Sequence, residues 1–183
     1  MKIAIDISQI VYEGTGVAEY VRQLVLHLLS LDSENDYILF FSHLRAEKQL
    51  NKFKQELAAS SVHKNYQIKR FRIPLFILEW LWNTFHVLPI ELFIGNVDVV
   101  YTSDWVESPV SKAKKITTIH DLSVLKMPET FDRKIVEVHI KKLRWVCMES
   151  DFILCDSKAT MDDAHLLLGI DTAKMAVVYP GLT

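Results

Sequence analysis

The chain has 183 residues, of which 50% are hydrophobic and 24% are charged. A chain of this length can bury enough surface for one hydrophobic core, so we expect a single domain. The 21 Lys and Arg residues against 23 Asp and Glu residues give a formal net charge of -2. This balance argues against a nucleic-acid-binding protein, because it provides no general basic field.

Seven short apolar runs rich in Val and Ile predict β-strands. They cover residues 2–8, 37–42, 67–71, 97–102, 115–121, 152–156 and 175–179. Apolar residues at helical spacing predict helices over residues 17–29, 50–57 and 135–147, and Ser157 and Gly169 bracket a further helix over residues 158–168. This alternation is typical of an α/β, Rossmann-like, doubly wound domain, with a mostly parallel sheet of about seven strands covered on both faces.

Polar residues follow the apolar strands, and the carboxyl ends of parallel strands share one edge of the sheet, where ligands bind. The strand-end residues are Ser8, Ser42, Ser103–Asp104, His120–Asp121 and Asp156–Ser157. Ser42 and Ser157 are expected to end a strand and cap a helix. The segment 116–121 is different, because an apolar, β-branched run ends abruptly in a histidine and a carboxylate. His120 and Asp121 are therefore the candidate catalytic residues.

Gly14, Thr15 and Gly16 stand immediately before the helix that begins near Val17. Glycines let backbone N–H groups approach an anion, and a helix N-terminus favours negative charge, so this loop is a candidate contact for a phosphate or a sugar. It is not a dinucleotide fingerprint, because Glu19 occupies the third glycine position and five residues separate the loop from the first strand. These departures argue against a Rossmann dehydrogenase.

The motifs of other familiar enzyme classes are also absent from the sequence. The sequence contains no Walker-type phosphate loop and no Gly-x-Ser-x-Gly nucleophile elbow. A metal phosphohydrolase would need further His and Asp ligands on helices, whereas His120–Asp121 ends a predicted strand. We therefore expect no bound metal.

The order of these motifs resembles the N-terminal domain of a glycosyltransferase family 4 (group 1) enzyme. The matching segments are residues 14–20 before the long helix, Thr118–Leu122 in mid-chain, Ile153–Lys158, and the closing run of residues 174–181. That family has the GT-B architecture, in which two Rossmann-like domains face each other across a cleft. The resemblance implies hexosyltransferase-type transfer from a nucleotide-sugar donor, with retention of configuration and without a metal or other cofactor.

The resemblance also implies roles for particular residues. The loop of Gly14, Thr15 and Gly16 would approach the donor phosphates and the reacting sugar. His120 would contact the sugar or the acceptor hydroxyl, and Asp121 would orient its loop. Asp104 and Trp105, at the end of the fourth predicted strand, are candidate acceptor contacts. The alternatives are a solvated carboxylate at Asp104 and packing against the sheet at Trp105.

We expect residues 1–183 to form the acceptor-side domain, with the nucleotide-sugar domain lying beyond Thr183. The chain alone would then be inactive, and its acceptor would be a polysaccharide, a glycolipid or another glycoconjugate. The alternative is a stand-alone α/β module that binds a carbohydrate or a protein.

The longest apolar region, residues 73–94, contains too many polar groups for a transmembrane helix. Three basic residues, Lys69, Arg70 and Arg72, precede Trp80 and Trp82. Two interpretations remain open: an ordinary core-facing helix, or peripheral contact of residues 69–94 with an anionic membrane surface.

The N-terminus begins at once with a strand pattern, so no signal peptide is expected. Cys147 and Cys155 have neither zinc-ligand nor C-x-x-C spacing, and we expect both to be buried and reduced. Together these features predict a cytoplasmic protein. The alternative is a cytoplasmic protein attached peripherally to the inner face of the membrane.

Overall fold

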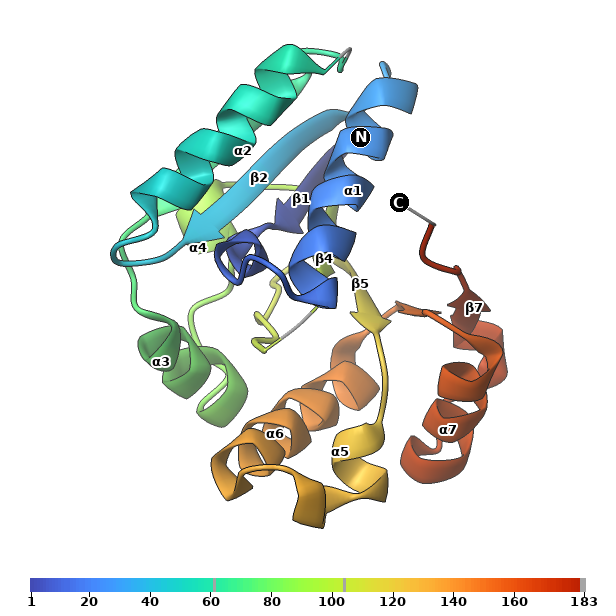
Figure 1. The fold of residues 1–183 in the computed structure, drawn as a ribbon. Helices are drawn as coiled ribbons and strands as arrows, with labels where there is room; N and C mark the ends of the chain where they lie inside the picture. Colours follow the sequence, from blue (N-terminus) through green and yellow to red (C-terminus); the bar gives the residue numbers. More distant parts are fainter. Residues whose placement is uncertain (61, 104, 182–183) are drawn as a thin grey trace.

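The computed structural model describes residues 1–60, 62–103 and 105–181. A seven-stranded parallel sheet in the order β3-β2-β1-β4-β5-β6-β7 forms its centre (Figure 1). The strands are β1 (Lys2–Asp6), β2 (Asp36–Ser42), β3 (Tyr66–Phe71), β4 (Val99–Thr102), β5 (Lys114–Ile119), β6 (Phe152–Cys155) and β7 (Met175–Val177). The α/β, Rossmann-like prediction is confirmed, although several strands end one or two residues earlier than expected.

Four long helices match the four predicted ones. They are α1 (Gly16–Leu31), α2 (Glu47–Ala59), α6 (Arg133–Glu149) and α7 (Lys158–Leu168). Ser157 caps α7 by accepting a hydrogen bond from the backbone N–H of Thr160, and Gly169 ends that helix with φ of 68°. The left-handed conformation at Gly169 is the one that only glycine adopts without strain.

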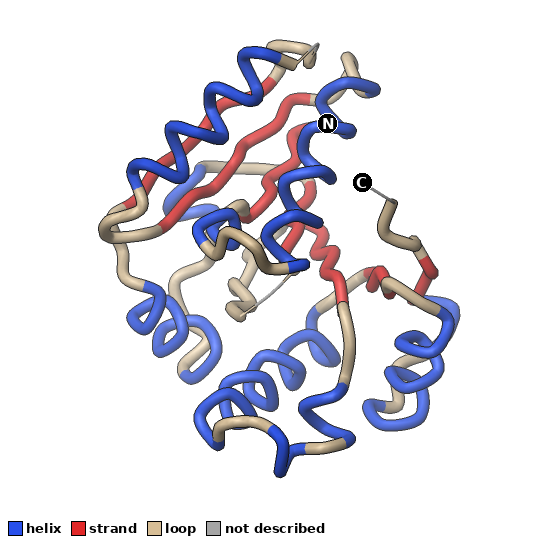
Figure 2. Tube along the Cα trace, viewed as in Figure 1, coloured by secondary structure: helices blue, strands red, loops and turns tan. Residues whose placement is uncertain are grey.

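Short helical segments complete the chain. They are α3 (Leu75–Leu78), α4 (Glu91–Ile94), α5 (Ser123–Lys126), a π-helix (Glu79–Thr84), and 3₁₀ turns at Ser8–Val11, Pro128–Thr130 and Thr172–Lys174. Helices flank the strands on both faces, and loops join them at the ends of the sheet (Figure 2). The sheet therefore presents its carboxyl edge to the loops and helix starts that follow the strands.

The apolar side chains of the strands alternate between two cores because successive residues of a strand point to opposite faces. On one face, Leu39 and Phe41 of β2 pack with the apolar stripes of α1 and α2. On the other face, Ile38 and Phe40 pack with residues around α3, the π-helix and α4, including Trp82. A third cluster, around Val146 and Ile153, fills the half of the sheet that carries β5, β6 and β7.

The region of residues 73–94 forms several short segments instead of one helix. His86 and Leu88 have positive φ values of 54° and 63°, which break the helical path between the π-helix and α4. Trp82 is buried, whereas Trp80 remains 58% exposed. The region therefore supplies core residues and an exposed aromatic surface at the same time.

The two cysteines differ from expectation in one respect. Both are free thiols, and Cys155 is buried as predicted, but Cys147 is exposed. Cys147 lies near the end of α6, where the amphipathic helix turns this position towards solvent.

No helix within the described residues combines the length and the apolar character needed to cross a bilayer.

Candidate functional site

The ends of β5 and β6 bring a histidine and a carboxylate together. The register pairs Ile119 with Cys155, so the next residues, His120 and Asp156, lie side by side at the carboxyl edge. His120 Nδ1 lies 2.7 Å from Asp156 Oδ2, and both side chains are mostly buried. Since an ionised carboxylate only accepts hydrogen bonds, Nδ1–H must donate to Asp156. The pair therefore fixes one tautomer of the imidazole.

Further contacts hold the histidine in place. The rings of His120 and of Tyr20 in α1 pack edge to face, with centroids 4.9 Å apart and planes at 81°. The hydroxyl of Thr160, in the first turn of α7, donates to the backbone carbonyl of His120 at 3.1 Å. His120 Nε2 is buried and bonds to no described residue, and the same is true of Asp156 Oδ1. Because buried polar atoms are normally hydrogen-bonded, Nε2 is suited to a ligand hydroxyl.

A pocket of about 760 Å³ surrounds this pair. Its lining comes from the first turns of α1, the ends of β5 and β6, and the chain after β7: Gly16, Val17, Glu19, Tyr20, Gln23, Leu24, His27, His120, Asp121, Asp156 and residues 178–181. The segment after β7 reaches the pocket because the N–H of Val178 donates to the carbonyl of Cys155 at 2.9 Å. This volume lies in the range of about 300–1,000 Å³ that small-molecule sites occupy.

Thr15 caps the start of α1 with two hydrogen bonds. Thr15 Oγ1 accepts a hydrogen bond from the backbone N–H of Ala18 at 3.3 Å and donates to the carbonyl of Tyr12 at 2.8 Å. Gly14 has φ of 84°, a conformation that favours glycine. Gly16 is the first residue of α1 and lines the pocket of His120. The positive end of the α1 dipole therefore faces that pocket.

A sequence profile of the family described as Glycosyltransferase Family 4 matches residues 14–183. The chain belongs to glycosyltransferase family 4. The resemblance drawn from the motif order is thus confirmed, and the His120 pocket lies on the carboxyl edge of a family 4 domain.

Two solved structures are similar to this family 4 chain, each at 13% sequence identity. One is HepE from Anabaena in complex with UDP, with a TM-score of 0.49, and the match covers 99% of this chain and 44% of that chain. The other is a short-chain dehydrogenase from Oenococcus oeni, with a TM-score of 0.38 and coverage of 94% and 66%. Among curated proteins, none matches the chain. The chain spans less than half of the length of HepE.

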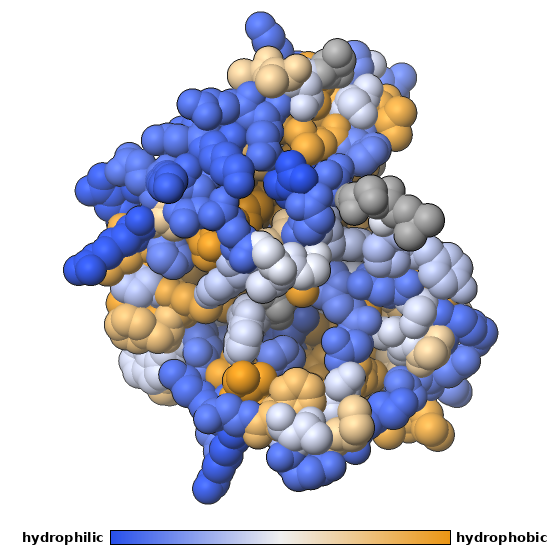
Figure 3. Space-filling view, viewed as in Figure 1, coloured by the Kyte–Doolittle hydropathy of each residue, from blue (hydrophilic) through white to orange (hydrophobic). Residues whose placement is uncertain are grey.

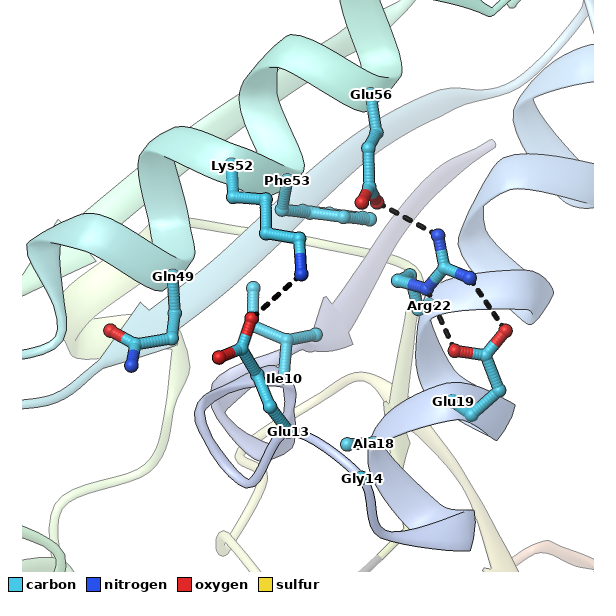
Figure 4. Close-up of a pocket in the computed structure, with 10 residues that line it drawn as sticks. All are labelled: Ile10, Glu13, Gly14, Ala18, Glu19, Arg22, Gln49, Lys52, Phe53 and Glu56. Atoms are coloured by element: carbon cyan, nitrogen blue, oxygen red, sulfur yellow. Dashed lines mark hydrogen bonds and ion pairs between the residues drawn. The ribbon is translucent and has the colours of Figure 1, made fainter.

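The three residues of the glycine loop do not share one cavity. Gly16 faces the His120 pocket, whereas Gly14 lines a smaller cavity of about 200 Å³ between α1 and α2 (Figure 4). There Arg22 bridges Glu19 and Glu56, at 2.6 and 2.9 Å. The other cation drawn in Figure 4, Lys52, lies 2.9 Å from Glu13. Among the described residues that line this smaller cavity, the two cations, Arg22 and Lys52, are thus already paired with carboxylates.

Asp121, the second candidate catalytic residue, lies on the rim of the His120 pocket and is exposed. Its Oδ1 accepts a hydrogen bond from the backbone N–H of Ser123 at 2.8 Å. This contact holds the turn that leads from β5 into α5. A catalytic role for Asp121 stays a prediction, and the partner of His120 is Asp156.

Of the two candidate acceptor contacts, the structure describes Trp105, which lines another cavity than this pair. Asp104 falls outside the described residues. The Trp105 ring packs at the edge of the core, with its centroid 5.0 Å from that of His139, and its carbonyl accepts a hydrogen bond from Asn83 at 2.7 Å. Trp105 lines a different, largely apolar cavity, which also touches Thr15 and Val17. Contact of Trp105 with an acceptor stays a prediction.

Asp156 and Tyr20 contact His120, but neither had been given a role in the site from the sequence. Asp156 stood among the polar strand ends and in the segment Ile153–Lys158, and its pairing with His120 depends on the order of strands in the sheet. Tyr20 lay in the segment of residues 14–20 and in the first predicted helix. In the described part of the chain, no group of three His, Cys, Asp or Glu side chains could hold a metal ion.

Proposed function

We propose that residues 1–183 form the acceptor-side domain of a retaining glycosyltransferase. It would transfer a sugar from a nucleotide-sugar donor to a polysaccharide, glycolipid or other glycoconjugate acceptor. The observation that carries this proposal is the His120–Asp156 pair beside the start of α1, in one open pocket of a family 4 domain. The nucleotide would be held mainly by a second domain across the cleft.

The chemistry of sugar transfer suits these groups. The bond between the anomeric carbon and the diphosphate oxygen breaks, the acceptor oxygen bonds to that carbon, and the hydroxyl proton passes to the departing diphosphate. Thr15 Oγ1 already accepts the N–H of Ala18, so the backbone N–H groups of Gly16 and Val17 are the ones at this helix start that can stabilise the negative charge that develops. His120 Nε2 would orient a hydroxyl of the sugar or acceptor. We propose that these groups act without a metal.

A donor assay tests this function. The full-length enzyme would be incubated with UDP-, GDP- and ADP-sugars, and release of the nucleoside diphosphate would be measured with and without candidate acceptors. We expect turnover of one nucleotide-sugar class by the full-length enzyme and none by residues 1–183 alone, because the second domain supplies most donor contacts.

Transfer by residues 1–183 alone would contradict the two-domain proposal. If the full-length enzyme turned over no nucleotide sugar, but residues 1–183 bound a carbohydrate, the stand-alone module would be correct.

A further inference from the structure

A second, apolar cavity of about 620 Å³ lies next to the His120 pocket. Side chains from α1, α3 and α6 form most of its lining, among them Val17, Leu75, Phe76, Ile135 and Val138. Its polar side chains are few, so a free oligosaccharide would lose more hydrogen bonds to water at such a wall than it could make with the protein. The cavity is therefore suited to hydrocarbon.

The two cavities share a wall at the start of α1. Thr15 and Val17 line the apolar cavity, Gly16 and Val17 line the His120 pocket, and Val17 thus belongs to both. The two cavities therefore adjoin at Val17, and a molecule whose sugar lies at His120 would have to carry its attached chain around this side chain to reach the apolar cavity.

Exposed aromatic side chains continue this apolar lining onto the surface. Phe76 is 66% exposed, Trp80 is 58% exposed, and Phe85 is 53% exposed. Trp80 and Phe85 pack edge to face with ring centroids 4.5 Å apart. Figure 3 shows apolar side chains gathered over α3 on the same face. Contiguous exposed apolar surface of this kind marks binding sites more often than chance.

The cavity also carries two opposite charges. Lys134 stands in the first turn of α6, which the Asp132 carboxylate caps, and Glu79 begins the π-helix. An anionic group would therefore prefer the α6 side of the cavity.

We infer that this cavity binds the apolar chain of a lipid-linked acceptor, with a phosphate of the acceptor beside Lys134. The inference rests on the proposed function, since it names the acceptor class of that same site. The shared lining residue Val17, the apolar lining and the charge at Lys134 favour a lipid phosphate over a free sugar.

Titration calorimetry with dodecyl phosphate, below its micelle concentration, tests the inference without any donor. The chain is expected to bind dodecyl phosphate at least about tenfold more tightly than butyl phosphate, because the longer chain buries more apolar surface. Phe76→Ser is expected to weaken dodecyl phosphate binding by about tenfold. Leu166→Ser, on α7, is the matched control, because Leu166 is 79% exposed and lies outside the cavity lining.

A charge pair provides the second arm. Lys134→Gln is expected to weaken dodecyl phosphate binding, and Glu79→Gln is expected to strengthen it. Equal binding of dodecyl and butyl phosphate, or unchanged binding in Phe76→Ser, would overturn the inference. A dimer seen by sedimentation and lost in Phe76→Ser would also overturn it and assign the face to a second copy of the chain.

The outcomes separate this inference from the proposed function. His120→Ala should leave dodecyl phosphate binding unchanged, since His120 lines the other pocket. If the enzyme turned over a nucleotide sugar but did not bind dodecyl phosphate, the lipid-binding inference would be refuted and the transferase function would stand. If the protein bound dodecyl phosphate but the enzyme turned over no nucleotide sugar, the transferase function would be refuted and the lipid-binding site would stand.

Discussion

At the scale of single residues, Asp156 gives His120 its orientation. The carboxylate accepts the hydrogen bond from Nδ1–H, with 2.7 Å between Nδ1 and Oδ2, and so leaves Nε2 as the atom available to a ligand. Tyr20 and Thr160 fix the ring and the backbone from two helices. The arrangement is that of a positioned imidazole whose partner comes from the neighbouring strand, and it can be tested by changing the partner alone.

We expect His120→Ala in the full-length enzyme to lower kcat by about 100-fold. Asp156→Asn should lower kcat by roughly tenfold, because the Asn carbonyl still accepts the Nδ1 proton, and Asp156→Ala should be more damaging. KM should change little. The ¹⁵N shifts of the His120 ring should report one tautomer in the wild type and a mixture in Asp156→Ala.

His63→Ala is the matched control, because His63 is exposed and does not line the pocket. Thermal unfolding should be the same for all these variants. If Asp156→Ala changed neither kcat nor the tautomer, Asp156 would have no positioning role.

At the scale of elements, buried Glu91 ties the short helix α4 to the turn before β5. One oxygen, Oε1, accepts backbone N–H bonds from Ser111, Lys112 and Ala113 at 2.8, 3.1 and 3.3 Å. Burial raises the pKa of the Glu91 carboxyl, but the backbone hydrogen bonds outweigh this effect, and its pKa lies below the ordinary value. The ionised form is therefore the one that the fold stabilises.

Glu91→Gln should lower the free energy of unfolding by about 2 kcal/mol at neutral pH, because it removes a charged acceptor. A carboxyl whose folded-state pKa is depressed stabilises the fold above its unfolded pKa of about 4.3. That stabilisation is lost as the pH falls through the lower folded-state value. The difference between wild type and variant should therefore shrink on acidification, as measured by urea unfolding at several pH values.

Exposed Glu129, in the 3₁₀ turn Pro128–Thr130, provides the control, since Glu129→Gln should have little effect at any pH. A constant difference between Glu91→Gln and wild type down to acid pH would show that the charge of Glu91 contributes nothing.

The elements differed in how well the sequence predicted them. Strands and long helices follow from local periodicity, which is why all seven strands and four helices were found. Residues 73–94 were harder, because a π-helix and positive φ at His86 and Leu88 have no periodic signal. Of the central pair of the candidate site, the sequence predicted His120 but not its partner Asp156. His120 ends an apolar run, but its pairing with Asp156 depends on strand order, which arises from packing across the whole sheet.

At the scale of the whole molecule, basic and aromatic side chains gather on neighbouring elements. Two of the three basic residues suspected from the sequence bind within the protein: Lys69 donates to the carbonyl of Ile94, and Arg70 pairs with Glu47. The helix α6 instead carries exposed basic residues beside the π-helix, where the Lys141 ammonium lies 3.2 Å from Thr84 Oγ1. Together with the exposed aromatic residues, this face has the composition of a membrane-binding surface.

We therefore expect the protein to co-sediment with vesicles containing about 30% phosphatidylglycerol but not with pure phosphatidylcholine. Trp80→Ser and Lys141→Gln should each reduce the bound fraction, whereas Leu166→Ser should not. About 0.5 M salt should release much of the protein, because it screens the charges and leaves only the aromatic contacts. If the protein bound neither kind of vesicle, the predicted membrane contact would be wrong. If it bound both kinds equally, the basic residues would have no role in that contact.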